Sequence, residues 1–332
     1  MSKPLIGIPL GDPAGIGPEI VVKALLNPKI YTCARPVVIG SAAVLRQTAE
    51  ILRADIKINT IAAPKEGNFA PGIVNLIDLA NIEPKDYRHG TVGAAAGRAA
   101  YEYIRTATEL ALDGQLAALA TTPINKEAIR ASGIDFIGHT EMLAALTKTE
   151  NPLTMFQTGN LRIFFLSRHL SLRAALELVT KENIIRTAEQ CLQALARLGF
   201  ADGCLAIAAL NPHGGEHGLF GTEEMTEIAP AVEALQARGL NVEGPVPADS
   251  VFHLARTGLY DAVLSLYHDQ GHIAAKTADF DRTVSLTLGL PFLRTSVDHG
   301  TAFGIAGKGI ASAVSMEEAI IQAASYCPHY RP

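Results

Sequence analysis

The segment Leu5–Glu19, LIGIPLGDPAGIGPE, reads as a strand, a turn and the start of a helix. Leu5–Leu10 is an apolar run of strand length, and Pro18 suits the first turn of a helix, where no N–H donor is needed. The turn between them, Gly11–Pro18, holds Gly15 and Gly17, but neither GxGxxG nor a Walker A motif occurs anywhere in the chain. A standard Rossmann dehydrogenase is therefore disfavoured, although the amides of this turn could bind an anion.

The same alternation of strand and helix continues along the chain. The apolar runs that predict strands are Leu5–Leu10, Val37–Gly40, Ile56–Ile61, Ile73–Leu79, Leu116–Ala120, Leu161–Ser167, Cys204–Leu210, Ala262–Tyr267 and Val284–Leu288. The predicted helices begin at Pro18 and cover Ala42–Leu52, Thr91–Asp113, Glu141–Leu146, Glu182–Leu198, Thr222–Arg238 and Met316–Tyr326. Most of the strand runs are continuously apolar, as is typical of strands buried on both faces. The sequence therefore predicts an α/β fold with a largely parallel sheet.

Composition narrows the class of protein. The 332 residues are 48% hydrophobic and 18% charged, which excludes a disordered chain or a coiled coil. The net charge of −5 gives no basic field for nucleic acid, and no apolar stretch is long enough to span a membrane. The N-terminus is too short and too interrupted by Pro and Gly for a signal peptide, and the four cysteines show no CxxC spacing. We expect a soluble, cytoplasmic protein.

Three of the 10 histidines follow apolar runs directly. His169, His213 and His268 end the segments IFFLSRH, LAIAALNPH and AVLSLYH. If these runs are strands, each imidazole lies at or just past a carboxyl end, where open α/β sheets bind ligands. Three imidazoles could hold a divalent metal there, with Asp269 orienting its neighbour or supplying an oxygen ligand. The alternative is three unrelated loop histidines.

Other polar segments suit an anionic substrate. His139 and Thr140 stand at the start of a predicted helix, where they could bind an anion or where Thr140 could simply cap the helix. Arg294 leaves a packed segment and could grip a carboxylate or phosphate through two hydrogen bonds. The remaining candidates for positive charge are Lys126, Lys276 and Arg282.

Taken together, the motifs resemble the 4-hydroxythreonine-4-phosphate dehydrogenase family over almost the full length. The matching segments are GDPAGIGPE (11–19), TTPINK (121–126), GHTE (138–141), SRHLSL (167–172), LNPHGGE (210–216), GTEE (221–224), GPVPAD (244–249), YHDQGH (267–272) and LGLPFLRTSVDHGTA (288–302). This family is itself similar to the isocitrate and isopropylmalate dehydrogenases. The resemblance implies two α/β/α domains with a cleft between them. We expect residues 1–125 and 290–332 to form the domain carrying much of the NAD site, and 126–289 to carry metal ligands, substrate ligands and dimer contacts.

The resemblance also assigns roles to residues. His169, His213 and His268 match the metal ligands, two from one subunit of a homodimer and one from the other; Zn, Mg, Co and Mn are all candidates. The positions that match substrate ligands are His139, Thr140, Lys276 and Arg294, with Ser285 standing where the family commonly has Asn. Lys276 or Asp249 could relay the proton of the alcohol. NAD, with NADP as an alternative, would bind the turn and the HGTA segment through Gly11, Asp12, Gly15, Gly17, His299, Gly300, Thr301 and Ala302.

The implied activity is a metal- and NAD-dependent oxidation of the C3 hydroxyl of 4-(phosphooxy)-L-threonine. The resulting β-keto acid decarboxylates to 3-amino-2-oxopropyl phosphate, a step of pyridoxal phosphate biosynthesis. Ser285 is shorter than Asn and lacks its amide, which leaves D-threonate or D-erythronate 4-phosphate as the alternative substrate, giving dihydroxyacetone phosphate and CO2 in sugar-acid catabolism. A non-catalytic binding protein and a metal-dependent hydrolase are the competing classes.

Overall fold

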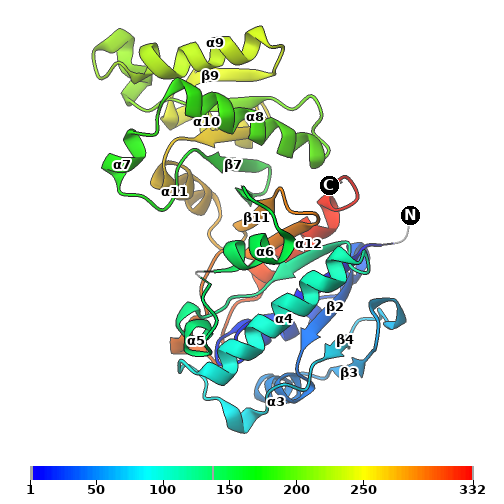
Figure 1. Ribbon diagram of the computed structural model, residues 1–332. Helices are drawn as coiled ribbons and strands as arrows, with labels where there is room; N and C mark the ends of the chain where they lie inside the picture. The colour runs from blue at the N-terminus through cyan, green and yellow to red at the C-terminus, as the bar shows by residue number, and fades with distance from the viewer. Residues whose placement is uncertain (1–2, 137, 331–332) are drawn as a thin grey trace. The chain divides into compact units, whose positions relative to one another are not determined.

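The computed structural model describes residues 3–136 and 138–330, and the chain divides into two compact units (Figure 1). The first unit is Met1–Pro152 with Thr287–Pro332, and the second is Leu153–Leu286. The sequence placed the division at 125/126, but α5 (Lys126–Ala131) and α6 (His139–Thr147) both contact α4 (Ala94–Leu112) of the first unit. His139 and Thr140 therefore belong to the first unit and not to the second.

The first unit is built on parallel strands in the order β3-β4-β2-β1-β5-β12. Their bounds are β1 Leu5–Pro9, β2 Arg35–Gly40, β3 Lys57–Thr60, β4 Ile73–Asp78, β5 Ala118–Thr121 and β12 Leu293–Val297. The other helices are α1 Gly17–Leu26, α2 Ile30–Cys33, α3 Ala42–Leu52 and α12 Val314–Tyr326, with short 3-10 turns at Pro64–Glu66, Pro84–Asp86 and Phe303–Ile305. Figure 1 shows α4 lying across these strands. The Ala-rich face of α4 packs on β1 and β2, because small side chains allow a close approach.

The second unit has its own strands, in the order β6-β7-β10-β8-β9. Their bounds are β6 Leu153–Thr158, β7 Leu161–Phe165, β8 Leu205–Ala208, β9 Val242–Val246 and β10 Ala262–Ser265. β6 runs antiparallel to β7, and the other pairs are parallel. The helices are α7 Leu172–Leu176, α8 Lys181–Arg197, α9 Ala229–Ala237, α10 Ala248–Arg256 and α11 His268–Ala278, with a 3-10 segment Pro212–Gly218 and a π turn Glu224–Ile228. β11, Val284–Leu288, crosses the division between the units.

The predicted α/β class and largely parallel pairing are confirmed, and each predicted strand is present. The apolar runs usually continue past the strand's carboxyl end into a buried turn, as at Leu10 after β1. β6, β9 and β12 are not among the predicted strands, because β6 and β12 mix polar residues into their runs and β9 contains Gly244-Pro245. Within residues 3–136 and 138–330, none of the helices combines the length and apolar character needed to cross a membrane.

Candidate active site

His169, His213 and His268 lie at one edge of the second unit's sheet. They follow β7, β8 and β10, and β10 pairs in parallel with both of the other strands. Because the carboxyl ends of neighbouring parallel strands meet at the same edge, the predicted placement of the histidines is confirmed. The ring centroids of His169 and His268 are 6.3 Å apart. Two of the imidazoles are exposed, and His268 is half-buried.

The ring of His268 is held by two neighbours. Its Nδ1 lies 2.6 Å from Oδ1 of Asp269, and its face stacks on His272 with centroids 3.7 Å apart. His272 is itself fixed, because its Nδ1 lies 3.0 Å from the His268 carbonyl and its ring packs on Phe156. A carboxylate on Nδ1 leaves Nε2 as the atom for an external ligand, which is how metal-binding histidines are usually oriented. The predicted orienting role of Asp269 fits this geometry.

His213 lies in a loop with unusual backbone geometry. The five residues His213–His217 all have positive φ, and the loop is fixed at its start by the buried carboxylate of Glu224. Oε1 of Glu224 accepts hydrogen bonds from the amides of Leu210 and Asn211 at 2.8 and 2.6 Å. Several hydrogen bonds from Asn211 and Leu210 offset the burial and lower the pKa of Glu224. The loop is thus anchored just before the imidazole. Glu224 stands in the matching segment GTEE, but the sequence had assigned no role to it.

The donors fit a divalent metal by their chemistry, since three imidazoles, one of them oriented by the Asp269 carboxylate, suit Zn, Co or Mn. Among residues 3–136 and 138–330 of a single chain, however, no cluster of three His, Cys, Asp or Glu side chains could hold a metal ion. The assignment of all three histidines to one metal therefore stays a prediction.

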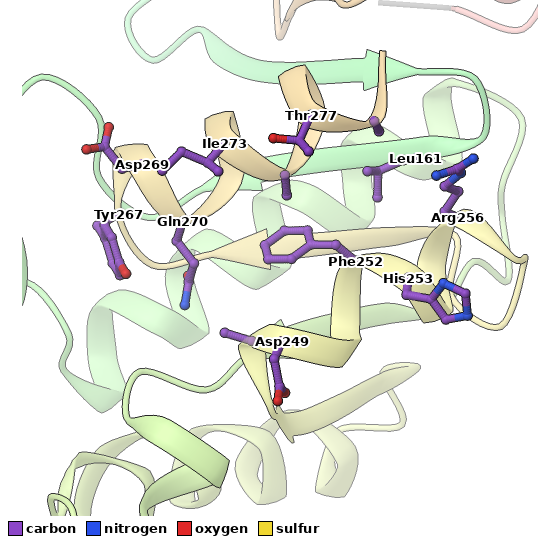
Figure 2. A pocket seen from close by; sticks show the side chains of 13 residues that line it. Leu161, Asp249, Phe252, His253, Arg256, Tyr267, Asp269, Gln270, Ile273 and Thr277 are labelled. Atoms are coloured by element: carbon purple, nitrogen blue, oxygen red, sulfur yellow. The ribbon is translucent and has the colours of Figure 1, made fainter. Parts of the chain in front are cut away.

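A cavity of about 570 Å³ lies between α10 and α11 of the second unit (Figure 2). In Figure 2 the ring of Phe252 lies in the middle of the lining residues, with Asp269 and Tyr267 on one side and His253 and Arg256 on the other. Asp249, one of the two predicted proton carriers, lines the cavity below Phe252, with its carboxylate pointing away from that ring. Of the other second-unit candidates, Lys276 has its Nζ 5.1 Å from the ring centroid of Phe280, and Ser285 is half-buried on β11.

Arg294 of the first unit is a buried cation, 5% exposed, on strand β12. Its Nε donates to Oγ1 of Thr121 at 2.9 Å and its Nη1 to Oγ1 of Thr287 at 3.0 Å. Burial lowers the pKa of Arg294 to about 9, against the opposing effect of the Glu141 carboxylate. The guanidinium is held by two hydroxyl groups, and among residues 3–136 and 138–330 no carboxylate forms an ion pair with it, which suits the predicted role in binding an anion. The sequence pointed to Arg294 but missed both threonines, which read as ordinary strand residues.

His139 opens α6, with Gly138 at the N-cap. Its Nε2 is buried and has no hydrogen-bond partner within the described ranges. Burial, together with the Arg294 cation, lowers the pKa of His139 well below its ordinary value. The imidazole is therefore neutral and can offer a donor or an acceptor to a ligand, while Thr140 next to it is half-buried in the first turn of α6.

The two predicted cofactor segments of the first unit lie against each other. The amide of Ile16 donates to the carbonyl of Thr301 at 3.1 Å, and Glu19 accepts from the amides of Gly309 and Ala311 at 3.2 and 2.6 Å. The two segments that the resemblance assigns to NAD therefore contact each other. A side chain at Gly15 would put its Cβ 2.9 Å from Cβ of Thr301, so the close approach requires glycine.

The remaining cofactor candidates divide between the two segments. Gly11 and Gly17 flank the turn, and Gly11 has a φ of 74°, which favours glycine. On the other segment His299, Gly300 and Ala302 are exposed. The sequence suggested that the amides of the turn could bind an anion, but those of Ala14, Gly15 and Ile16 already donate within the protein. That suggestion is wrong for these three amides.

Comparison with known proteins agrees with this arrangement. Proteins provisionally named D-threonate 4-phosphate dehydrogenase, from Clostridium botulinum (strain Hall) and Halalkalibacterium halodurans, are 56% and 58% identical to the chain; each alignment covers 99% of it, and 99% and 98% of the relative. The crystal structure of 4-hydroxythreonine-4-phosphate dehydrogenase from Klebsiella pneumoniae is 42% identical with a TM-score of 0.89, covering 98% of this chain and 100% of that one. Residues 32–323 match the family described as pyridoxal phosphate biosynthetic protein PdxA. The chain therefore belongs to the PdxA family of dehydrogenases.

Proposed function

We propose that this protein is a metal- and NAD-dependent dehydrogenase that oxidises the C3 hydroxyl of D-threonate 4-phosphate. The observation that carries the proposal is the buried Arg294 guanidinium, which has two hydroxyl partners and the neutral His139 near it. This arrangement suits a small acid with more than one anionic group. The names of the relatives at 56% and 58% identity favour the sugar acid, and so does Ser285, which cannot supply the amide of an Asn.

In the proposed reaction the first-unit residues position the substrate. Arg294 grips a carboxylate or phosphate through its remaining N–H groups, since a planar guanidinium binds such oxygens through two bonds. His139 and Thr140 add hydrogen bonds at the start of α6. Holding both ends of the acid would align the C3–H bond with the nicotinamide ring. Such alignment is a main source of the rate enhancement in enzymes.

The second-unit residues would act on the hydroxyl group. His169, His213 and His268 would hold the metal, with Asp269 fixing the ring of His268. When bound, the metal would supply Lewis acidity and NAD would supply the hydride acceptor. Asp249 or Lys276 would take up the hydroxyl proton. Decarboxylation of the β-keto acid from D-threonate 4-phosphate leaves dihydroxyacetone phosphate.

The proposed functional unit is a homodimer in which one metal ligand comes from the second copy. Within the described residues, one chain brings His169 and His268 together but forms no three-membered ligand group. The cavity between α10 and α11 is lined by residues of α11, the helix that begins at His268. One of these residues, Ile273, is 63% exposed. We therefore assign this face to the second copy.

The second candidate substrate is 4-(phosphooxy)-L-threonine, oxidised to a keto acid that gives 3-amino-2-oxopropyl phosphate in pyridoxal phosphate biosynthesis. The observation that favours it is the 42% identity with the Klebsiella pneumoniae enzyme, whose name states a 4-hydroxythreonine phosphate. Both substrates place a phosphate, a secondary hydroxyl and a carboxylate on four carbons. They differ at C2, where one carries a hydroxyl and the other an amine.

One assay separates these candidates. Purified protein, a divalent metal and NAD are incubated with D-threonate 4-phosphate, D-erythronate 4-phosphate or 4-(phosphooxy)-L-threonine, and NADH is followed by its absorbance. We expect the highest kcat/KM with D-threonate 4-phosphate, and product analysis should identify dihydroxyacetone phosphate. A higher kcat/KM with the amino acid would select the second candidate. Absence of NADH with every substrate and metal would overturn the dehydrogenase proposal for these acids.

A further inference from the structure

The loop Pro212–Gly218 has a left-handed backbone that needs support from the rest of the second unit. The φ angles of the five residues His213–His217 lie between 45° and 82°. Glycine adopts such angles freely, but three of these five residues carry a side chain, and in a left-handed backbone Cβ crowds the following carbonyl oxygen. Strained residues persist only where the surrounding structure fixes them, and they gather at functional sites.

The side chains of the loop contribute little to fixing it. Pro212, His213, Glu216 and His217 are exposed, whereas Gly215 is buried. An exposed side chain gains little from packing, because its apolar surface stays in water. The conformation of the loop must therefore be fixed through its backbone.

The carboxylate of Glu224 contacts this backbone at two places. Glu224 is 3% exposed, and its Oε1 accepts from the amides of Leu210 and Asn211, where the chain enters the loop. Its Oε2 accepts from Nδ2 of Asn211 at 2.9 Å. The backbone of Gly215 approaches the same oxygen closely, since a Cβ atom there would lie 2.7 Å from Oε2. One buried side chain thus fixes the loop at its entrance and at its centre.

Two neighbouring carboxylates show what is particular to Glu224. Glu223 is half-buried and accepts from Nδ2 of Asn211 at 2.7 Å, a contact with a side chain. Glu227 is half-buried too, and its Oε2 accepts from the amide of Lys181 at the start of α8. Of the three carboxylates, Glu224 is the one that accepts main-chain N–H groups at the entrance of the loop.

We infer that Glu224 is a positioning residue for the metal site: it holds the loop in its left-handed conformation, so that the imidazole of His213 is in place before the metal binds. This inference rests on the proposed function, in which His213 is a metal ligand. A ligand that is already in position loses less conformational freedom on binding, so the metal is held more tightly. Replacing a residue that orients a metal-binding histidine typically weakens metal binding about ten- to a hundredfold.

The test is the Glu224→Gln variant, stripped of metal and titrated with Co²⁺ in a calorimeter. Glutamine keeps the size of the side chain, but its NH2 group would meet either Nδ2 of Asn211 or the main-chain amides, all of which are donors. The dissociation constant for Co²⁺ should rise about tenfold or more. Saturating Co²⁺ should restore kcat, because the bound metal then holds the imidazole itself. Glu227→Gln is the matched control and should bind Co²⁺ like the unmodified protein.

A double variant shows whether Glu224 acts through His213. His213→Ala should itself weaken the binding of Co²⁺. If Glu224 acts through this imidazole, adding Glu224→Gln to His213→Ala should weaken the binding no further. If Glu224 supports the second unit in general, the two losses should add.

Two glycine variants test the same contact from the side of the loop and leave Glu224 intact. Gly214→Ala and Gly215→Ala introduce the same methyl group at φ angles of 70° and 82°, so the backbone strain is similar. The methyl group at Gly215 would meet Oε2 of Glu224, whereas none of the described residues would have an atom within 4 Å of the one at Gly214. Gly215→Ala should therefore weaken Co²⁺ binding about tenfold more than Gly214→Ala.

Three results would overturn the inference. One is unchanged Co²⁺ affinity in Glu224→Gln while His213→Ala is impaired. The second is an additive loss in the double variant, and the third is an equal affinity of the two glycine variants for Co²⁺. Failure of the proposed function is recognised separately, because His213→Ala would then bind Co²⁺ as tightly as the unmodified protein.

Discussion

The residues proposed to bind the substrate anion in the first unit and the histidines of the second unit differ in their burial and in how firmly neighbouring side chains hold them. Arg294 and Nε2 of His139 are buried, and Thr121 and Thr287 hold the guanidinium before any ligand arrives. His169 and His213 are exposed. In the proposed function, the groups that would hold the substrate anion are therefore already positioned within one chain, whereas the metal site would take a ligand from a second copy.

The largest effect is expected from His213→Ala. Loss of a metal ligand removes several kcal/mol of Lewis-acid stabilisation, so kcat/KM should fall about a thousandfold or more. Circular dichroism and the thermal midpoint should not change, because the side chain is exposed. His217→Ala, an exposed histidine with positive φ in the same loop, is the matched control and should retain activity and bound metal. Near-normal turnover of metal-free His213→Ala would remove the metal from the mechanism.

Mixing inactive variants tests whether the metal site is shared between copies. His169→Ala, His213→Ala and His268→Ala are refolded together in pairs, and NADH formation is measured. If two ligands come from one chain and one from the other, two of the three mixtures should regain about a quarter of the activity, because half of the dimers are mixed and each has one intact site. The third mixture should stay inactive and so identifies the two ligands that share a chain. Recovery in none of the mixtures would show that each site lies within one copy.

The Arg294→Lys variant tests whether the buried guanidinium of the first unit binds the substrate. Lysine keeps the charge but loses the planar fork and the bonds to Thr121 and Thr287. The KM for the phosphorylated acid should rise about a hundredfold, with a smaller change in the KM for NAD⁺. Arg282→Lys is the control, since this exposed arginine pairs with Asp279 at 3.6 Å. Equal effects on both KM values would place Arg294 in the support of the strand and not in the substrate site.

The two regions also differ in how well their sequences predicted them. The positions of the histidines were predicted because each follows an apolar run in the sequence. Such a run indicates both that a strand is present and where its carboxyl end lies. The order β7-β10-β8, which brings them to one edge, is set by pairing between distant segments and is not visible locally. Thr121, Thr287 and Glu224 received no role from the sequence, since each acquires its role only through a contact that forms when the chain folds. The division near Pro152 was missed because no Gly- or Pro-rich linker marks it.

A smaller effect is expected from Ser285→Asn, which restores the side chain common in the family. The added amide should favour the amino acid over the sugar acid, and an extra hydrogen bond shifts the ratio of kcat/KM values by about tenfold. Ser285→Ala is the control and should leave the ratio close to that of the unmodified protein. The ratio is measured by assaying the variant with both acids. An unchanged ratio in Ser285→Asn would show that other residues distinguish the C2 amine from the C2 hydroxyl.

The smallest effect is on stability and concerns Asp12. Burial raises the pKa of Asp12 from 3.8 to about 6. Between these two pH values, Asp12 is protonated in the folded chain but ionised in the unfolded chain. Stability attributable to this group is therefore lost as pH rises from about 4 to about 6 and stays constant above that. Tyr87 and Tyr103, which interact with Asp12, have pKa values raised by burial and stay neutral throughout. The free energy of unfolding of Asp12→Asn, relative to the unmodified protein, should thus increase by about 1–2 kcal/mol between pH 4.5 and 7.5 in urea titrations. A pH-independent difference would mean that the Asp12 carboxylate meets water in the free protein, and the first unit would then be less fully pre-formed than its buried groups indicate.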